Sequence, residues 1–282
     1  MMHLQESWGM NVILDLFLGG MGAAAFILAL YDYLKGEREL SLKVAFAGVI
    51  SLILGLLFLV SHLGKPEAAF HVFLSPNTSS VMTYGVFFNI LFLVFGGLFV
   101  LPALLPKLPY SGKAGAMKLL GVIGGIFALL VMIYTGLLIA RTSYPLWRNP
   151  AVPLLFVLTA LSAGAGLYIL VAEALKKTFP SRLISLSLLT TFLAFLAFTS
   201  MLLLVDIAPL AYRESVHFML SENLAATMLL YLVGFAAPFL VSLAQRGRSS
   251  KALTLVLALA LILQALLCRY LVVSSAFMEL PW

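Results

Sequence analysis

The sequence predicts an all-α, polytopic integral membrane protein with eight transmembrane helices. Three observations support this fold class: the composition, the lengths of the apolar runs and the distribution of the basic residues. Hydrophobic residues make up 63% of the 282 residues and charged residues only 10%, whereas a soluble domain carries about 25% charged residues. Because a water-soluble fold cannot hide this much apolar surface, we expect one membrane domain covering residues 1–282.

Eight mostly apolar runs are long enough to cross a bilayer, which takes about 20 residues of helix. They are Met10–Leu30, Leu42–Leu63, Thr83–Leu104, Met117–Ile139, Val152–Leu175, Leu183–Val205, Leu224–Leu243 and Ala252–Val273. The runs lack the alternation of barrel strands, so we expect helices. We do not expect the first run to be a cleavable signal peptide, because it has no basic region before it and contains Asn11 and Asp15.

The basic residues alternate between the two sides of the predicted bundle. Most of them lie in the connections after the first, third, fifth and seventh runs: Lys35, Arg38, Lys43, Lys107, Lys113, Lys118, Lys176, Lys177, Arg182, Arg246, Arg248 and Lys251. Cytoplasmic connections are enriched in Lys and Arg, so both termini are expected on the outer, periplasmic side of the cytoplasmic membrane. The outer connections are longer and chemically mixed, which indicates that the outer face carries the function.

Asp15 is the clearest ionisable residue inside a predicted span, where a charge costs about 2.5–3.5 kcal/mol on insertion scales. Asn11 lies one turn earlier on the same side. Gly19 begins a run of small residues along which a helix or a flat ligand could approach. One interpretation is a polar patch near the outer surface that binds a ligand or exchanges protons. The other is a pair of interfacial residues wetted by lipid headgroups.

Tyr134, followed by Thr135, lies in the outer half of the fourth run. A tyrosine within an apolar span needs a partner for its hydroxyl group. That partner is either a carbonyl of a bound ring or a group on a neighbouring helix.

Two further sets of ionisable residues lie near the ends of spans. Glu173 and Lys177 have the spacing of a surface ion pair on a helix, and a proton-entry role for Glu173 is the alternative. Arg269 lies about one turn from the outer end of the last run. We expect its side chain to extend outward or to pair with Asp206 or Glu222.

The histidines and the cysteine argue against a redox centre held by this protein. His3, His62, His71 and His217 all fall outside the centres of the spans, whereas haem needs axial ligands at depth. The single cysteine, Cys268, cannot hold an iron–sulfur cluster. No metal-binding or soluble catalytic motif is present, so we expect no metal site. We attribute the net positive charge to the basic residues of the cytoplasmic connections, which set the orientation in the membrane. We therefore expect no nucleic-acid partner.

The stretch His62–Gly85, HLGKPEAAFHVFLSPNTSSVMTYG, resembles the connection after the second helix in the polysulfide reductase membrane-subunit family, also called NrfD-like. The family pattern is close to D-L-G-R-P followed by N-P-N-x-x-S-x-M-S-W-G. The matching positions are Leu63, Gly64, Pro66, Pro76, Asn77, Ser80, Met82 and Gly85, and the departures are His62, Lys65, Ser75, Thr83 and Tyr84. The stretches YTGLL from Tyr134, VGFAAPFL around Pro238 and RYLVV from Arg269 are similar to motifs in the family's later helices.

The resemblance implies a quinone-binding membrane anchor. Such subunits anchor a molybdopterin catalytic subunit and a four-cluster iron–sulfur subunit on the outer face, bind menaquinone or ubiquinone, and hold no haem or cluster of their own. The family uses a polar residue at the start of its first helix and the tyrosine of its fourth-helix motif, which correspond to Asp15 and Tyr134. The implied role is quinol oxidation in anaerobic-type respiration, with a polysulfide- or thiosulfate-like substrate handled by another subunit.

The resemblance and the residues together give the following candidate roles. The set expected to bind quinone is Asn11, Asp15, Gly19, Tyr134 and Thr135. His62 and Glu67 are expected to relay protons outward, and Glu173 and Arg269 complete the candidate proton path. The residues expected to contact the iron–sulfur partner are Lys65, Glu67, His71 and Asn77.

Two other functions stay open at the level of the sequence. Eight helices with buried polar residues also suit a secondary transporter, although such proteins often show inverted repeats and none is evident here. The third possibility is a haem-bearing quinol dehydrogenase subunit. Membrane lipid surrounds the protein under all three interpretations.

Overall fold

A computed structural model describes residues 2–62, 80–245 and 250–279 of the chain. Within these ranges, eight spans are long and apolar enough to cross a membrane, which confirms the predicted number. They are α1 (Met10–Lys35), α2 (Arg38–His62), α4 (Val81–Val100), α5 (Ala114–Ala140), α6 (Ala151–Ala174), α7 (Arg182–Leu203), a seventh span made of α9 (Leu224–Leu229), η4 (Leu230–Ala236) and α10 (Ala237–Ala244), and α11 (Lys251–Ser274). Short 3-10 turns, η2 (Leu101–Ala103) and η3 (Leu204–Ile207), extend α4 and α7.

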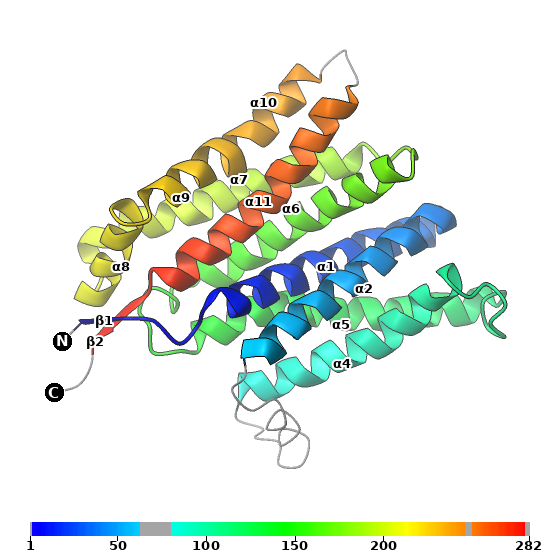
Figure 1. Ribbon diagram of the computed structural model, residues 1–282, viewed down its shortest axis with the longest axis horizontal. Helices are drawn as coiled ribbons and strands as arrows, with labels where there is room; N and C mark the ends of the chain where they lie inside the picture. Colours follow the sequence, from blue (N-terminus) through cyan, green and yellow to red (C-terminus); the bar gives the residue numbers. More distant parts are fainter. Residues whose placement is uncertain (1, 63–79, 246–249, 280–282) are drawn as a thin grey trace.

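The spans form two groups of four that pack side by side (Figure 1). The first group contains α1, α2, α4 and α5, and the second contains α6, α7, α9–α10 and α11. The two groups meet where α1 packs against α6 and α11. These three helices are mostly buried, whereas the outer helices of both groups expose many large apolar side chains. That exposure suits a surface in contact with lipid.

Small residues allow the central helices to approach closely. A Cβ atom at Gly22 of α1 or at Gly48 of α2 would overlap the backbone carbonyl of the other glycine. Gly164 of α6 packs in the same way against Ala24 of α1. Without a hydrophobic driving force between helices in lipid, such close van der Waals packing is a main source of helix association.

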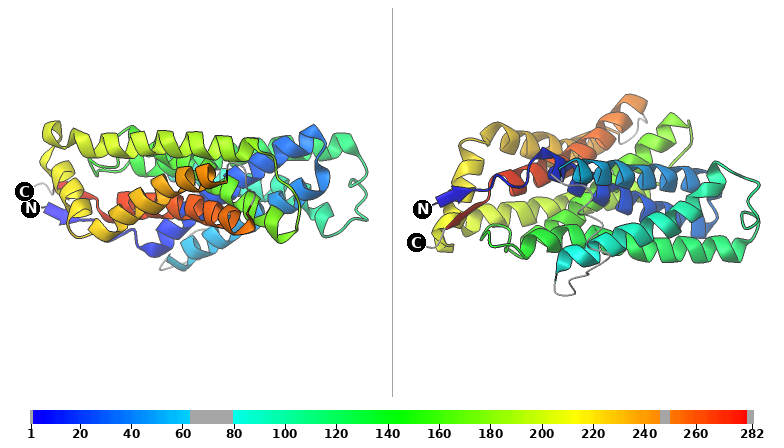
Figure 2. Two further views of the ribbon diagram at one scale, coloured as in Figure 1. Left: turned by 90° about the horizontal axis from the view of Figure 1, so that it is seen from above. Right: turned by 60° about the horizontal axis from the view of Figure 1, so that its bottom comes forward.

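One end of the molecule, here called the terminal end, carries both chain termini. There β1 (Met2–Leu4) pairs antiparallel with β2 (Phe277–Glu279), so the two termini lie side by side (Figures 1 and 2). The surface helix α8 (Leu210–Leu220), which joins η3 to α9, packs against β2 through the rings of Phe218 and Phe277. These two strands were not expected from the sequence, because three-residue strands show no alternation.

The opposite end, here called the basic end, contains the connections that are rich in Lys and Arg. Asp32 is buried near the end of α1 and forms an ion pair with Arg182 at the start of α7. Arg182 also lies over the ring of Tyr31, 4.5 Å from its centroid. Glu39 at the start of α2 binds Lys177 at 3.2 Å. These contacts tie the first group to the second at the basic end.

Replacing Gly48 with alanine should destabilise the protein by about 1–3 kcal/mol, because the new methyl group must push α1 and α2 apart. The unfolding temperature of the full-length protein in detergent measures this loss. The single cysteine, Cys268, is buried, so its reaction with a thiol-reactive dye reports unfolding. Gly97→Ala is the control, because no atom lies within 4 Å of a Cβ atom built at that position. Equal unfolding temperatures for the two variants would contradict the packing argument.

Candidate functional site

The fold brings Asp15 of α1 and Tyr134 of α5 together in the terminal-end half of the first group. Asp15 is half-buried against Gly55 of α2, where a Cβ atom would lie 3.3 Å from the Asp15 Oδ1 atom. The ring of Tyr134 lies over Gly85 of α4, where any Cβ atom would overlap it. Asp15 is near enough to the Tyr134 phenol for an electrostatic interaction between them. Helices α1 and α2 thus flank the carboxyl group, and α4 and α5 flank the phenol.

Gly55 and Gly85 leave the space that the side chains of Asp15 and Tyr134 occupy. A larger residue at position 55 would collide with the backbone of α1 as well as with Asp15, because the Asp15 carbonyl oxygen and the Gly19 nitrogen lie 3.2 and 3.3 Å from a Cβ atom there. Gly19 itself lies in this interface and is buried beside Leu52. Gly55 was not among the residues predicted from the sequence, because a glycine within an apolar run gives no signal of its partner.

Polar groups continue from Asp15 toward the terminal end. The Asn11 side-chain amide donates to Ser61 Oγ at 3.2 Å, and His62 Nε2 lies 2.9 Å from the Ser7 carbonyl oxygen. Asn11 is half-buried and His62 is exposed. The predicted residues Asn11, Asp15, Tyr134 and His62 are therefore arranged from the interior of the first group toward its surface.

Other predicted residues lie elsewhere. Thr135 is buried and donates its hydroxyl to the Met132 carbonyl of its own helix at 2.9 Å, so its role in binding stays a prediction. Glu173 is half-buried at the basic end of α6. The remaining predicted residues lie outside the described part of the sequence: Lys65, Glu67, His71 and Asn77.

The expectation that Glu173 pairs with Lys177 is wrong. Helix α6 ends at Ala174, so the two residues do not share a helical face. Lys177 binds Glu39 of α2 instead. The i, i+4 rule requires an unbroken helix, and the backbone leaves the helix before Lys177, since Lys176 has a φ of 54°.

The expectation for Arg269 is also wrong, since its side chain neither extends outward nor pairs with an acid. It is fully buried. Its guanidinium group donates to the Leu16 carbonyl of α1, to the Phe156 carbonyl and Thr159 hydroxyl of α6, and to the Ala265 carbonyl of its own helix, all at 3.0–3.1 Å. Oxygen atoms of three packed helices supply the acceptors, so no carboxylate is needed.

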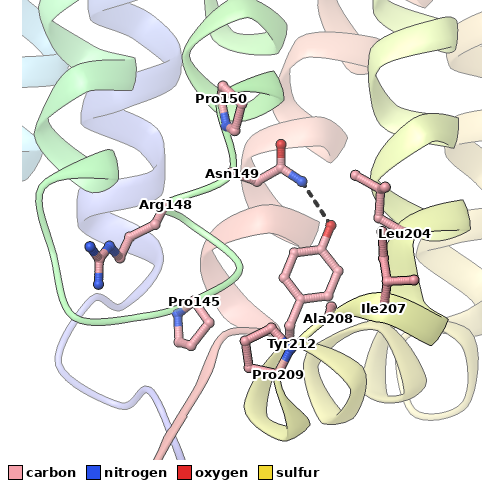
Figure 3. A pocket seen from close by; sticks show the side chains of 9 residues that line it. All are labelled: Pro145, Arg148, Asn149, Pro150, Leu204, Ile207, Ala208, Pro209 and Tyr212. Atoms are coloured by element: carbon pink, nitrogen blue, oxygen red, sulfur yellow. Dashed lines mark hydrogen bonds between the residues drawn. The ribbon is translucent and has the colours of Figure 1, made fainter.

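A surface groove at the terminal end lies away from Asp15 and Tyr134. It has a volume of about 300 Å³ and lies between the α5–α6 connection, η3 and α8 (Figure 3). Its residues are Pro145, Arg148, Asn149, Pro150, Leu204, Ile207, Ala208, Pro209 and Tyr212. Burial raises the pKa of the Tyr212 phenol, and the hydrogen bond from Asn149 offsets part of that rise. Tyr212 in turn donates to the Met201 carbonyl, so the phenol stays neutral and both groups are satisfied.

Comparison with known proteins assigns the sequence to a family. The family model described as "Polysulphide reductase, NrfD" matches residues 1–281. The chain belongs to the polysulphide reductase NrfD family. The resemblance noted in the sequence is confirmed, and the eight spans show that this NrfD-family member is a multi-pass membrane protein.

Curated relatives agree with the NrfD assignment. The sequence is 31% identical to protein NrfD of Escherichia coli (strain K12) over 193 residues, or 60% of each protein. It is 29% identical to the C component of the polysulfide reductase of Wolinella succinogenes over 175 residues, or 56% of this protein and 55% of the relative. It is 30% identical to a protein NrfD homolog of Haemophilus influenzae over 201 residues. The protein thus spans about three fifths of the length of the curated relatives that it matches.

Within residues 2–62, 80–245 and 250–279, no group of three or more His, Cys, Asp or Glu side chains is arranged to hold a metal ion. The side chains of Asp15, Tyr134 and Asn11 can form hydrogen bonds, and the carboxyl group of Asp15 can exchange a proton.

Replacing Arg269 with lysine should lower the unfolding temperature substantially, because an ammonium group cannot reach acceptors on three helices at once. Each charged hydrogen bond that is lost costs about 1.5–3 kcal/mol. Thermal unfolding of the full-length protein in detergent measures the effect. The control is Arg148→Lys, since Arg148 is exposed. An unchanged unfolding temperature for Arg269→Lys would show that these hydrogen bonds do not hold the helices together.

Proposed function

We propose that the protein is the quinone-binding membrane subunit of an oxidoreductase complex and that it oxidises quinol between Asp15 and Tyr134. The observation that carries the proposal is the placement of Asp15 against Gly55 and of Tyr134 against Gly85, near enough for an electrostatic interaction between the two side chains. A flat, uncharged ring needs a narrow site with a few polar groups. The names of the relatives, which include a component of a reductase, support membership of such a complex. Family membership also favours this function over a transporter or a haem-bearing subunit.

The residues of the site suit the chemistry of quinol oxidation. Loss of two electrons and two protons converts quinol to quinone. The Tyr134 phenol binds one oxygen of the ring and holds it in place, while Asp15 binds the other oxygen and, as general base, accepts the two protons in turn, passing on the first before it takes the second. The two electrons would go to an acceptor outside this site, and an iron–sulfur cluster of the proposed partner subunit would supply that acceptor.

Protons leave toward the terminal end under this proposal. Asn11, Ser61 and His62 form the polar groups between Asp15 and the surface. His62 suits a relay, because an ordinary histidine exchanges protons near neutral pH. Glu67 would continue the path as predicted from the sequence. Glu173 lies at the opposite end of the molecule, so a path through it would have to cross the bundle.

The terminal end is the proposed docking face for an iron–sulfur subunit of the four-cluster type, which in turn joins a molybdopterin catalytic subunit. Lys65, Glu67, His71 and Asn77 follow directly after α2, whose last residue is His62. The docking face would therefore be close to the quinol site, as electron transfer requires. With the basic end in the cytoplasm, the terminal end and both termini face outward from the inner membrane.

Tyr134→Phe should weaken the binding of a fluorescent quinol analogue about tenfold, because one hydrogen bond to the ring is lost. Saturable quenching during titration of the purified full-length protein gives the affinity. Tyr231→Phe is a matched control, since the Tyr231 hydroxyl bonds with Thr199 in the second group. The absence of saturable binding to folded wild-type protein, or equal affinity in wild type and Tyr134→Phe, would count against the proposed site.

Asp15→Asn should slow quinol oxidation by the assembled complex about a hundredfold or more, because the amide cannot act as a general base. The amount of assembled complex should stay close to that of wild type. Turnover per complex in membranes, together with the complex content, measures both effects. Asp206→Asn, at an exposed position of η3, is the control. If assembly fell as far as turnover, Asp15 would have a structural role.

A further inference from the structure

Asn89 is a polar residue of α4 that the functions described so far do not use. It lies one helical turn after Gly85, and its side-chain nitrogen donates to the Gly85 carbonyl oxygen at 2.9 Å. Its Oδ1 atom is buried, and no described residue donates a hydrogen bond to it. A buried acceptor without a partner has lost the hydrogen bonds to water that it makes in the unfolded protein. Such a group needs an explanation, and a bound ligand is one.

The position of Asn89 on α4 places it beside the proposed quinol site. Gly85, Phe92 and Gly96 form the buried stripe of this helix, and Asn89 falls on the same stripe between Gly85 and Phe92. The Phe92 ring contacts Phe26 of α1, with 5.0 Å between the ring centroids. At the other end of this stretch, Gly85 receives the ring of Tyr134. Asn89 therefore faces α1 and α5, one turn deeper than the Tyr134 ring.

The hydrogen bond to the Gly85 carbonyl also determines which atom of the Asn89 amide has no hydrogen-bond partner. A backbone carbonyl oxygen can only accept a hydrogen bond, so the amide nitrogen must be the atom that faces it. The remaining atom, Oδ1, is an acceptor and cannot donate. A ligand that satisfies Oδ1 must therefore supply a donor.

We infer that Asn89 makes the site selective for the reduced form of its ligand, by accepting a hydrogen bond from a quinol hydroxyl group. This inference rests on the proposed function. The oxygen atoms of a quinone have no hydrogen and can only accept. With quinone bound, Asn89 Oδ1 stays without a donor. With quinol bound, it is satisfied. Tyr134 does not discriminate in this way, because its hydroxyl can donate to either form.

The consequence is a difference in affinity between the two redox forms. One satisfied hydrogen bond in place of a buried, unpaired acceptor corresponds to about tenfold tighter binding of quinol. A site that binds the reduced form more tightly also raises the reduction potential of the bound pair relative to the free pair, by linkage. Asn89 would thus hold quinol until its protons are removed and release the oxidised product readily.

The test compares two redox forms of one probe. Dimethylnaphthoquinone and dimethylnaphthoquinol are titrated into the full-length protein in lipid nanodiscs under anaerobic conditions, and the two dissociation constants are measured by calorimetry. Wild type should bind the quinol form about tenfold more tightly than the quinone form. Asn89→Leu should reduce this preference by weakening quinol binding alone, and the part that remains comes from Asp15, which also accepts from a quinol hydroxyl. Asn89→Asp keeps an acceptor oxygen at the same position and should retain the preference.

Several outcomes separate this inference from the proposed function. Equal affinities of wild type for both forms would overturn the inference while leaving the quinol site in place. The same holds if Asn89→Leu weakens both forms equally, because that is the signature of a structural role or of a bound water. Binding of neither form to folded wild type would overturn both. Asn149→Leu, in the groove beside Tyr212, is the control and should leave the ratio unchanged. Asn89→Ala, a smaller substitution that also lacks an acceptor, repeats the comparison if Asn89→Leu fails to fold.

Discussion

The arrangement of the helices depends on one buried cation. A charge inside an apolar bundle costs about 2.5–3.5 kcal/mol on insertion scales, and Arg269 is tolerated because oxygen atoms from α1, α6 and α11 surround its guanidinium group. Those acceptors are in reach only if the three helices hold one relative position. The position also requires Gly20, where a Cβ atom would lie 2.8 Å from the Arg269 Nη2 atom. Satisfying the cation thus fixes the contact between the two groups of helices.

The placement of α1 then determines the proposed site. Arg269 holds the Leu16 carbonyl from the side of the second group, while the preceding residue, Asp15, lies against α2 in the first group. One short stretch of α1 therefore contacts the buried cation on one side and carries the proposed functional carboxyl group on the other. Deeper in the same interface Gly22 and Gly48 pack closely, and the Ser51 hydroxyl donates to the Leu18 carbonyl. Under the proposed function, protons from Asp15 leave toward the terminal end, where Asn11 and His62 lie.

The proposed site depends on glycine residues as much as on its polar side chains. Gly55 and Gly85 make the space in which Asp15 and Tyr134 meet, and the carbonyl of Gly85 orients the amide of Asn89. The two ends of the bundle differ in the side chains that they carry. Ion pairs such as Asp32 with Arg182 close the basic end, whereas the terminal end presents hydrogen-bonding groups and aromatic rings. The molecule therefore has one end that holds the helix groups together and one that is suited to exchange with partners.

The number of spans and the family could be predicted from the sequence, because apolar length and local motifs are readable residue by residue. The same reading marks Asp15 and Tyr134 as candidates, and their role stays a prediction. The partners of Arg269, the end of α6 that separates Glu173 from Lys177, and the unpaired Oδ1 atom of Asn89 could not be predicted. Arg269 and Leu16 are 253 positions apart. The sequence around a glycine or an asparagine in an apolar run does not indicate which residue of another helix it contacts. These points were settled in three dimensions, because hydrogen-bond partners and close approaches between helices depend on how distant segments pack.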